Sequence, residues 1–365
     1  MARLFFRVLF AGPLLAGCLY LLYINESRLV ERERDLAMSQ SLAVSTPADR
    51  VDPALEGKLI HVSARAMAPG EAAVLRDPVL GITAEGLRLK RQVQMYQWKE
   101  RSETRSSSSG RTTTSTTVYF YDQDWAPDRI ESNAFHRGGH ANPPLLLNSE
   151  NVYAPRVLLG AYELSPWFVW LLEPGAGVRL DASMLERRSP DLQAPVHLQD
   201  ASTLFVGQDP NSPKLGDLRI SYRVVPLTSM VTVVGKQVGN RIEKYEDPDT
   251  GKRIALVMPG EQPLEAFFTR LQESNQEDAW PMRLVCGVFV FIFLLPFAFL
   301  LPSFTGPLSH GQMVCACVLL CVPGSVLPMG LAWLGVKPLT GMGLMGSGGL
   351  GMYGVLRLMR WWARA

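Results

Sequence analysis

Residues 284–356 decide the fold class, because they hold three long apolar segments in close succession. The segments are Leu284–Leu301 (LVCGVFVFIFLLPFAFLL), Met313–Leu334 (MVCACVLLCVPGSVLPMGLAWL) and Leu339–Leu356 (LTGMGLMGSGGLGMYGVL), and none contains Asp, Glu, Lys or Arg. A helix that spans the hydrocarbon core needs about 20 apolar residues, since each residue rises about 1.5 Å through about 30 Å. None of the segments shows the polar face of a soluble core helix. The sequence therefore predicts three transmembrane helices here.

A fourth apolar segment, residues 8–24, follows Arg3 and Arg7 near the N-terminus. Such a segment is either a signal peptide that is removed or a retained membrane anchor. Leu15-Ala16-Gly17-Cys18 resembles the cleavage box of bacterial lipoproteins, which favours processing. The segment stays apolar from Leu19 to Ile24, however, where a processed lipoprotein turns polar. We expect a retained first transmembrane helix.

Basic residues beside the apolar segments predict the orientation in the membrane, because cytoplasmic loops carry an excess of Lys and Arg. Arg3 and Arg7 place residues 1–7 in the cytoplasm, and a basic tail at 357–365 is expected on the same side; its arginines are Arg357, Arg360 and Arg364. Four spans bring both chain ends to one side, so the two observations agree. The region between the first and second spans is then extracytoplasmic.

The region between the first two spans divides into a charged part and a β-rich part. Residues 25–55 begin with mixed charges, as in Glu31–Asp35, which predicts a solvated stalk helix followed by a linker. Residues 56–262 show strand patterns: Lys58–Val62 alternates polar and apolar residues, and the Thr-, Val- and Tyr-rich residues 112–121 suit the return strand of a long hairpin. We expect a large β-rich extracytoplasmic domain there.

Two segments of this β-rich region resemble each other. Asp77-Pro78 precedes Gly86-Leu87-Arg88-Leu89, and Asp209-Pro210 precedes Gly216-Asp217-Leu218-Arg219-Ile220. Each segment leads into a predicted strand. Residues 56–262 are therefore either one domain or two related β modules.

Residues 263–280 predict an amphipathic, membrane-proximal helix. Leu264, Phe267, Phe268 and Leu271 have the i, i+3, i+4, i+7 spacing of one helix face, and Pro263 suits the first turn. We expect this face to dock the β-rich domain onto the bilayer or the spans.

Small residues mark one face of the last apolar segment. Gly343, Ser347 and Gly351 are four residues apart, with Gly354 close beside them. Small side chains let two helices approach closely in lipid. The stripe predicts either packing against another span of the same chain or self-association of the protein.

Composition and motifs narrow the function. The formal net charge of +2 gives no indication of nucleic-acid binding, and all five cysteines lie in apolar segments. The sequence contains no Walker loop, Gly-x-Ser-x-Gly elbow, His-Glu-x-x-His or Cys-x-x-Cys motif. We therefore predict no catalytic residue, cofactor or metal. Two alternatives stay open: an extracytoplasmic metal-dependent enzyme around His136 and His140, and a transporter, although the spans lack the ionisable residues that transporters use.

Several stretches resemble the transmembrane protein 43 family, also called the LUMA family. Leu87–Trp98 (LRLKRQVQMYQW), in which Met-Tyr-Gln-Trp follows a basic strand, is the most specific of them. The other matching stretches are individually weaker but occur in the same order as in the family. The full set is Glu56–Val62, Leu87–Trp98, Asp124-Trp125, Gly139–Pro143 and Gly216–Ser221.

The resemblance implies an α+β membrane protein with four spans, one N-terminal and three C-terminal, and a large lumenal or periplasmic domain. It implies an organiser of membrane protein complexes and brings no catalytic residues. The Ala-, Leu-, Gly- and Arg-rich composition and the short loops indicate a bacterial member, in the inner membrane with the domain in the periplasm. We expect the lipid bilayer and unidentified membrane proteins as partners, with a homo-oligomer as an option.

Overall fold

The computed structural model describes residues 2–109, 112–187, 194–248, 251–298 and 308–364. Within these ranges it leaves out the side chains of residues 2–9, 106–109, 112–114, 186–187, 296 and 298. The chain forms two compact units: a helical unit from its two ends (residues 1–42 and 263–365) and a β unit from residues 43–262.

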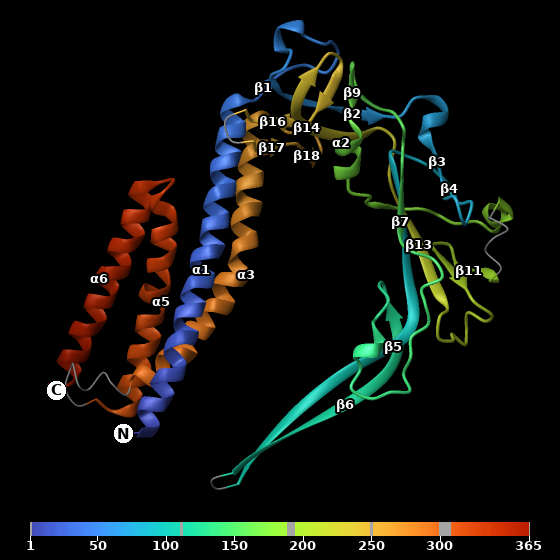
Figure 1. Cartoon of the computed structure of the whole chain (residues 1–365). Helices are drawn as coiled ribbons and strands as arrows, with labels where there is room; N and C mark the ends of the chain where they lie inside the picture. Colours follow the sequence, from blue (N-terminus) through green and yellow to red (C-terminus); the bar gives the residue numbers. More distant parts are fainter. Residues whose placement is uncertain (1, 110–111, 188–193, 249–250, 299–307, 365) are drawn as a thin grey trace. The chain divides into compact units, whose positions relative to one another are not determined.

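Long helices build the helical unit (Figure 1). They are α1 (Ala2–Leu42), α3 (Leu264–Ala298), α5 (His310–Leu334) and α6 (Pro338–Trp362). Helix α1 packs against α3 and α5, and α6 packs against α5. Among the described residues, the parts at 264–295 and 310–334 are long and apolar enough to cross a membrane. The predicted span at 339–356 falls within α6, whose mean hydropathy is lowered by repeated glycines, and the end of the span predicted at 284–301 lies outside the described residues.

Helices α1 and α3 each join an apolar stretch to a polar one without interruption. Helix α1 runs on through the charged residues to Leu42, and α3 starts at Leu264 and continues past Pro281 into the apolar segment. The amphipathic segment at 263–280 and the following apolar segment are therefore parts of one helix. Phe267 and Phe268 are fully buried and pack edge to face with their ring centres 5.4 Å apart. Docking by this face remains a prediction.

A ring of strands forms the first part of the β unit. Strand β2 (Leu59–Met67) pairs with β8 (Val157–Leu159) and with β14 (Ser229–Val238); β9 (Tyr162–Leu164) and β15 (Arg241–Glu243) complete the ring between them. The short strands β1 (Val44–Ser45) and β18 (Leu256–Pro259) are added to β2 and β14. Helix α2 (Pro166–Leu171) inserts Phe168 against Gly235, where an added Cβ would lie 2.6 Å from the ring.

A second sheet has the strand order β11-β12-β13-β5-β6. Strands β5 and β6 form the predicted hairpin, and beyond Met95 and Ala126 β5 pairs with β6 alone, as the long ribbon in Figure 1. The strands of this sheet are β5 (Arg88–Ser109), β6 (Thr112–Ala126), β7 (Glu150–Tyr153), β10 (Ala176–Gly177), β11 (Val196–Asp200), β12 (Thr203–Val206) and β13 (Leu218–Val225). Two separate strand pairs are β3 (Val74–Arg76) with β4 (Thr83–Glu85), and β16 (Tyr245–Glu246) with β17 (Arg253–Ile254).

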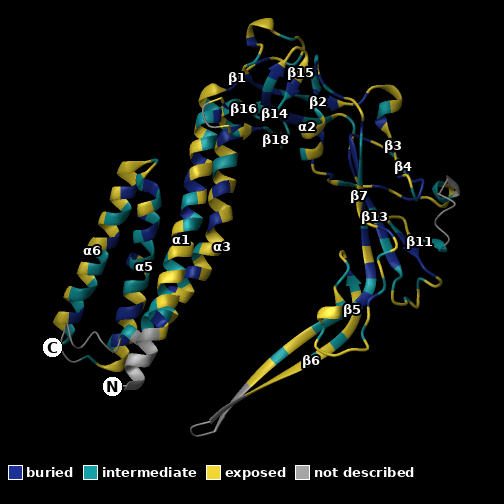
Figure 2. Ribbon diagram, viewed as in Figure 1, coloured by how far each residue is buried: buried dark blue, intermediate teal, exposed yellow. Residues whose placement is uncertain are grey.

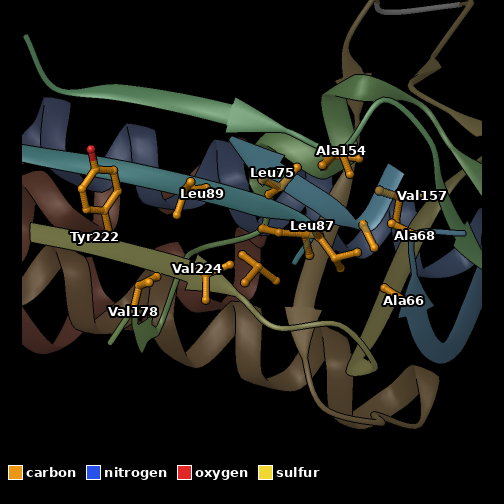
Figure 3. Close-up of a cluster of buried hydrophobic side chains, with 14 of the residues drawn as sticks. Ala66, Ala68, Leu75, Leu87, Leu89, Ala154, Val157, Val178, Tyr222 and Val224 are labelled. Atoms are coloured by element: carbon orange, nitrogen blue, oxygen red, sulfur yellow. The ribbon is translucent and has the colours of Figure 1, made fainter. Parts of the chain in front are cut away.

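One continuous apolar core serves both sheets (Figures 2 and 3). Strands of the two sheets alternate along the chain, so neither sheet is a separate stretch of sequence. The two segments that resemble each other lie in β5 and β13, which are hydrogen-bonded neighbours in the second sheet. Leu89 on β5 and Val224 on β13 are register partners and meet in this core (Figure 3).

A buried polar network fastens the β3–β4 hairpin to the second sheet. Arg91, whose side chain is 3% exposed, forms an ion pair with Asp77, which is 2% exposed. The other oxygen of Asp77 accepts hydrogen bonds from the main-chain N–H groups of Val79 and Leu80, at 2.8 and 2.9 Å. The hydroxyl of Tyr222 also donates to Asp77, at 2.8 Å. Burial, and then the charge of Asp77, raise the pKa of Tyr222, so the phenol stays a donor.

His61 joins the two ends of the β unit. Its ring nitrogens lie 3.1 Å from the hydroxyl of Ser45 and 3.0 Å from the main-chain oxygen of Gln262, the last residue of the unit. The imidazole is 3% exposed, and burial lowers its pKa. The two contacts suit a neutral ring that donates to Gln262 and accepts from Ser45.

The β unit should lose stability when His61 is protonated. Because folding lowers the pKa of His61, its stabilising contribution is complete above the usual histidine pKa of about 6.5 and is lost as the pH falls through the folded pKa. Limited proteolysis should therefore cut the wild-type β unit faster at acidic than at neutral pH. The variant His61→Gln, which keeps hydrogen-bonding groups but does not titrate, should show a smaller difference. An equal pH effect in both proteins would contradict this role of His61.

Candidate functional site

A cleft of the β unit lies on the outer face of the second sheet. It has a volume of about 630 Å³ and is named here the strand-face cleft. Strands β5 and β13, which carry two of the stretches that resemble the family, form its floor. Its lining residues are Lys90, Gln92, Val93, Gln94, Pro127, Ser149, Gln199, Asp200, Thr203, Arg219, Ile220 and Ser221.

Strand alternation explains why the lining is polar. Successive side chains of a strand point to opposite faces, so Leu89, Arg91, Val93 and Met95 point inward while Lys90, Gln92 and Gln94 face outward. The antiparallel register places Gln94 opposite Arg219, Gln92 opposite Ser221, and Lys90 opposite Arg223; these six outward residues form one polar face. Sequence reasoning identified both strands through the resemblance but did not predict that they are neighbours.

Arg219 is held flat in the cleft. Its guanidinium carbon lies 4.2 Å from the centre of the Trp125 ring, and Trp125 is packed between Tyr96 at 5.3 Å and Phe205 at 6.3 Å. Stacking on an aromatic ring orients the guanidinium and leaves its edge free to donate. The Nε atom of Arg219 is buried and has no hydrogen-bond partner in the described part of the chain. A buried donor without an acceptor is costly, and the other N–H groups of this guanidinium, which lines the cleft, can donate to a ligand there.

The polar face carries three cations, Lys90, Arg219 and Arg223. Asp200 and Asp124 accept hydrogen bonds from other groups than these three. Asp200 accepts hydrogen bonds from the hydroxyl and main-chain N–H of Ser202, and these lower its pKa. Asp124 accepts from the ammonium of Lys99 at 2.8 Å, which lowers the pKa of Asp124, and the positive charge of Arg219 acts in the same direction. Across the described ranges, no ion pair engages Lys90, Arg219 or Arg223. Lys90 and Arg219 outweigh Asp200 in the cleft lining, so the cleft carries a small net positive charge, and Arg223 lies beside it as the register partner of Lys90.

His136 and His140 lie in a loop that covers the base of the β5–β6 ribbon. The His136 ring stacks on Tyr119 with centres 4.0 Å apart, and the His140 ring stacks on Tyr121 at 3.8 Å. Asn142 anchors the loop: its side chain accepts from the N–H of Trp98 and donates to the carbonyl of Trp98. No group of three His, Cys, Asp or Glu side chains that could hold a metal ion occurs among the described residues. The loop is thus packed by aromatic contacts.

The helical unit contains a buried ion pair that sequence reasoning missed. Glu26, 1% exposed, accepts two hydrogen bonds from Arg283, at 2.6 and 2.9 Å, and one from the indole of Trp333 at 3.3 Å. Glu33, 6% exposed, accepts from Lys337 at 3.0 Å. The charged part of α1 was predicted to be solvated. These two glutamates instead face α3 and α5, because helix–helix packing offers them cationic partners.

A helical pattern in the charged segment could have indicated this packing. Glu26, Leu29, Val30 and Glu33 have the i, i+3, i+4, i+7 spacing of one helix face, and all four are buried. Two amides reinforce the same contact: Asn25 donates to the main-chain oxygen of Ala279, and Asn275 on α3 donates to that of Leu29. The many charged residues around this helix face made its spacing hard to recognise in the sequence.

The small residues of α6 divide between two faces. An added Cβ at Gly351 would lie 3.0 Å from Pro323 of α5, so Gly351 packs within the chain. Gly343, Ser347 and Gly354 are exposed, and a Cβ at either of these glycines would meet no atom within 4 Å. The tightest α5–α6 contact is at Gly341, where a Cβ would lie 2.6 Å from the main-chain nitrogen of Leu334.

Two helices of the described residues that are long and apolar enough to cross a membrane, together with a β-rich unit, fit the class of membrane proteins with a large folded domain. The chain belongs to the transmembrane protein 43 family, because the family model described as Transmembrane protein 43 matches residues 95–338. The mouse protein named Transmembrane protein 43 is 28% identical over 276 residues, and the human one is 29% identical over the same length. The Drosophila homologue is 28% identical over 282 residues, which cover 74% of this chain and 70% of that protein.

The matches to the mouse and human proteins cover 72% of this chain and 66% of theirs, slightly less than two thirds of their length. No solved structure matches the chain. The predicted family is thus confirmed, and the family match includes Met95-Tyr96-Gln97-Trp98, the most specific of the motifs.

Proposed function

We propose that this protein is a membrane-anchored scaffold whose β unit binds membrane protein partners outside the cytoplasm. In this proposal four helices span the membrane, both chain ends are cytoplasmic, and the membrane is a bacterial inner membrane with the β unit in the periplasm. The relatives are named as transmembrane proteins, without a catalytic name. The observation that carries the proposal is the strand-face cleft, an open polar cleft of about 630 Å³ on a unit joined at both ends to long helices.

Site-specific photo-crosslinking in native membranes tests the scaffold function. A photoreactive amino acid at Gln94, an exposed cleft residue, should give a discrete crosslinked product. The same amino acid at Asn211, on an exposed turn that does not line the cleft, is the control. Crosslinks at both positions alike, or at neither, would count against a binding role of the cleft.

The β unit should be accessible from outside the cytoplasm. The variant Ser102→Cys places a thiol on the exposed part of the β5–β6 ribbon, and the native cysteines lie in the apolar segments. This thiol should react with a membrane-impermeant maleimide in intact spheroplasts, as the arginines beside the predicted spans require. Arg360→Cys, in the predicted cytoplasmic tail, is the control and should react only after lysis. The reverse pattern would overturn the orientation.

We further propose that the free small-residue face of α6 supports self-association. The double variant Gly343→Ile/Gly354→Ile should convert an oligomer in mild detergent into a folded monomer, since both glycines are exposed and bulkier side chains block close helix approach. Gly341→Ile is the matched comparison and should disrupt the α5–α6 contact instead, lowering the thermal stability. A wild-type protein that is monomeric at every concentration in size-exclusion chromatography with light scattering would refute self-association.

A further inference from the structure

Three cations, Lys90, Arg219 and Arg223, share one face of β5 and β13 and form no ion pair in the part of the chain that the structure describes, although the charge of Asp124 acts on Arg219 from a longer distance. Lys90 and Arg223 are register partners, so their side chains leave the sheet side by side. Like charges directly opposite each other on two strands are destabilising. Arg219 faces outward on the same strand as Arg223, and burial of its Nε without an acceptor adds a second cost. An anion bound here relieves the repulsion between Lys90 and Arg223 and accepts hydrogen bonds from the other N–H groups of Arg219.

The geometry of Arg219 favours a carboxylate. A guanidinium fixed on the Trp125 ring presents a planar fork of N–H donors, which matches the two oxygens of a carboxylate. The Trp125 ring is engaged by Arg219, Tyr96 and Phe205, which disfavours a ligand that binds by stacking on this ring, such as a neutral sugar. The anionic groups of the ligand, and not its rings, are what the cleft recognises.

The size and remaining lining of the cleft favour a peptide. A volume of about 630 Å³ far exceeds that of a single inorganic ion and accommodates several residues. Beside the cations, the cleft presents side-chain amides and hydroxyls, from Gln92, Gln94, Thr203 and Ser221, which can bond both N–H and C=O groups. The carboxylate of Asp200 offsets part of this positive charge, and the hydroxyl and main-chain N–H of Ser202 occupy one of its oxygens.

We propose that the strand-face cleft binds an acidic segment of a partner protein. One carboxylate pairs with the guanidinium of Arg219, and Lys90 and Arg223 attract further carboxylates of the same segment. The inference rests on the proposed scaffold function and specifies the chemistry of the partner.

Binding of a defined peptide to the full-length protein in detergent tests this chemistry. The probe is a fluorescent peptide of alternating glutamate and serine, and its counterpart has glutamine in place of glutamate. Fluorescence anisotropy at low salt should show binding of the acidic peptide only, and added salt should weaken it, because exposed charges are screened. Arg219→Gln should weaken binding by about tenfold, the loss expected for one charge-assisted pair.

Two further variants separate local recognition from general attraction. Lys90→Gln should weaken binding of the acidic peptide as well, whereas Arg253→Gln, which removes an exposed arginine of β17, should leave it unchanged. Arg219→Lys keeps the charge but loses the fork, so its binding should fall between the wild type and Arg219→Gln. Peptide binding is compared only among variants whose melting temperature equals that of the wild type, so that a loss of binding does not reflect unfolding.

The outcomes distinguish this inference from the scaffold function. Equal binding of the two peptides, or equal losses in Arg219→Gln and Arg253→Gln, would overturn the acidic-segment inference. A crosslinked product at Gln94 that persists in Arg219→Gln membranes would retain the scaffold and reject the cleft chemistry. Peptide binding by the purified protein without any crosslinked product in membranes would retain the cleft chemistry and reject the scaffold function.

Discussion

Replacing Arg283 with leucine is expected to destabilise the helical unit by about 3–5 kcal/mol, the usual cost of removing one partner of a buried ion pair. The substitution leaves the Glu26 carboxylate, which is 1% exposed, with the indole of Trp333 as its only donor among the described residues. Glu26 holds α1 against α3 and α5 at this point, so the loss should separate the helices. The measurement is reversible unfolding in mixed detergent micelles, followed by circular dichroism.

A neighbouring pair on the same two helices provides the control. Arg32 and Asp278 also connect α1 to α3, but their side chains are 67% and 71% exposed and 3.9 Å apart. Exposed pairs contribute little, so Arg32→Leu should change the stability by less than about 1 kcal/mol. The double variant Glu26→Leu/Arg283→Leu should recover part of the loss, because it leaves no buried charge. If Arg283→Leu and Arg32→Leu have equal effects, burial of the Glu26–Arg283 pair is not what stabilises this contact.

The second large effect is expected at Asp77. Asp77→Ala removes the acceptor of Arg91, Tyr222 and two main-chain N–H groups at once. Arg91 would keep Glu150 and the main-chain oxygen of Asn148 as partners, yet the buried guanidinium would lose its closest carboxylate. We expect a loss of about 3–5 kcal/mol, seen as faster proteolysis of the β unit and a lower melting temperature.

The matched control for this variant is Asp209→Ala. Asp209-Pro210 repeats the sequence Asp77-Pro78, and Asp209 likewise accepts a main-chain hydrogen bond, from Asn211 at 2.9 Å. Asp209 is exposed, however, and takes part in no ion pair of the described residues, so its loss should cost at most about 1 kcal/mol. If the two variants are equally stable, the network around Asp77 contributes no more than a surface turn does.

Local patterns in the sequence predicted much of the fold. Alternation at residues 58–62 indicated a strand and the composition of residues 112–121 indicated the return strand of a hairpin, and β2 and the β5–β6 hairpin are present there. The apolar segments at 313–334 and 339–356 lie within α5 and α6. These predictions succeed because a helix or strand buries one face according to a repeat of a few residues, which is readable along the chain.

The candidate site was less predictable. The resemblance drew attention to Leu87–Trp98 and Gly216–Ser221, yet nothing in either stretch states that Gln94 lies opposite Arg219. The stripe at Gly343, Ser347, Gly351 and Gly354 was identified by spacing alone, and the structure divides it, because Gly351 packs against α5 while the other three residues are exposed. Which face of a helix finds a partner depends on the position of the other helix.

By itself, the sequence determined the family, the long apolar helices and the β-rich region between the two helical ends, since hydropathy and alternation are properties of neighbouring residues. Only the tertiary structure decided which charges are buried. Glu26 and Arg283 are 257 positions apart, and Asp77 and Tyr222 are 145 apart. A charge can leave water only where a partner compensates its lost hydration, and that partner is supplied by packing between distant segments.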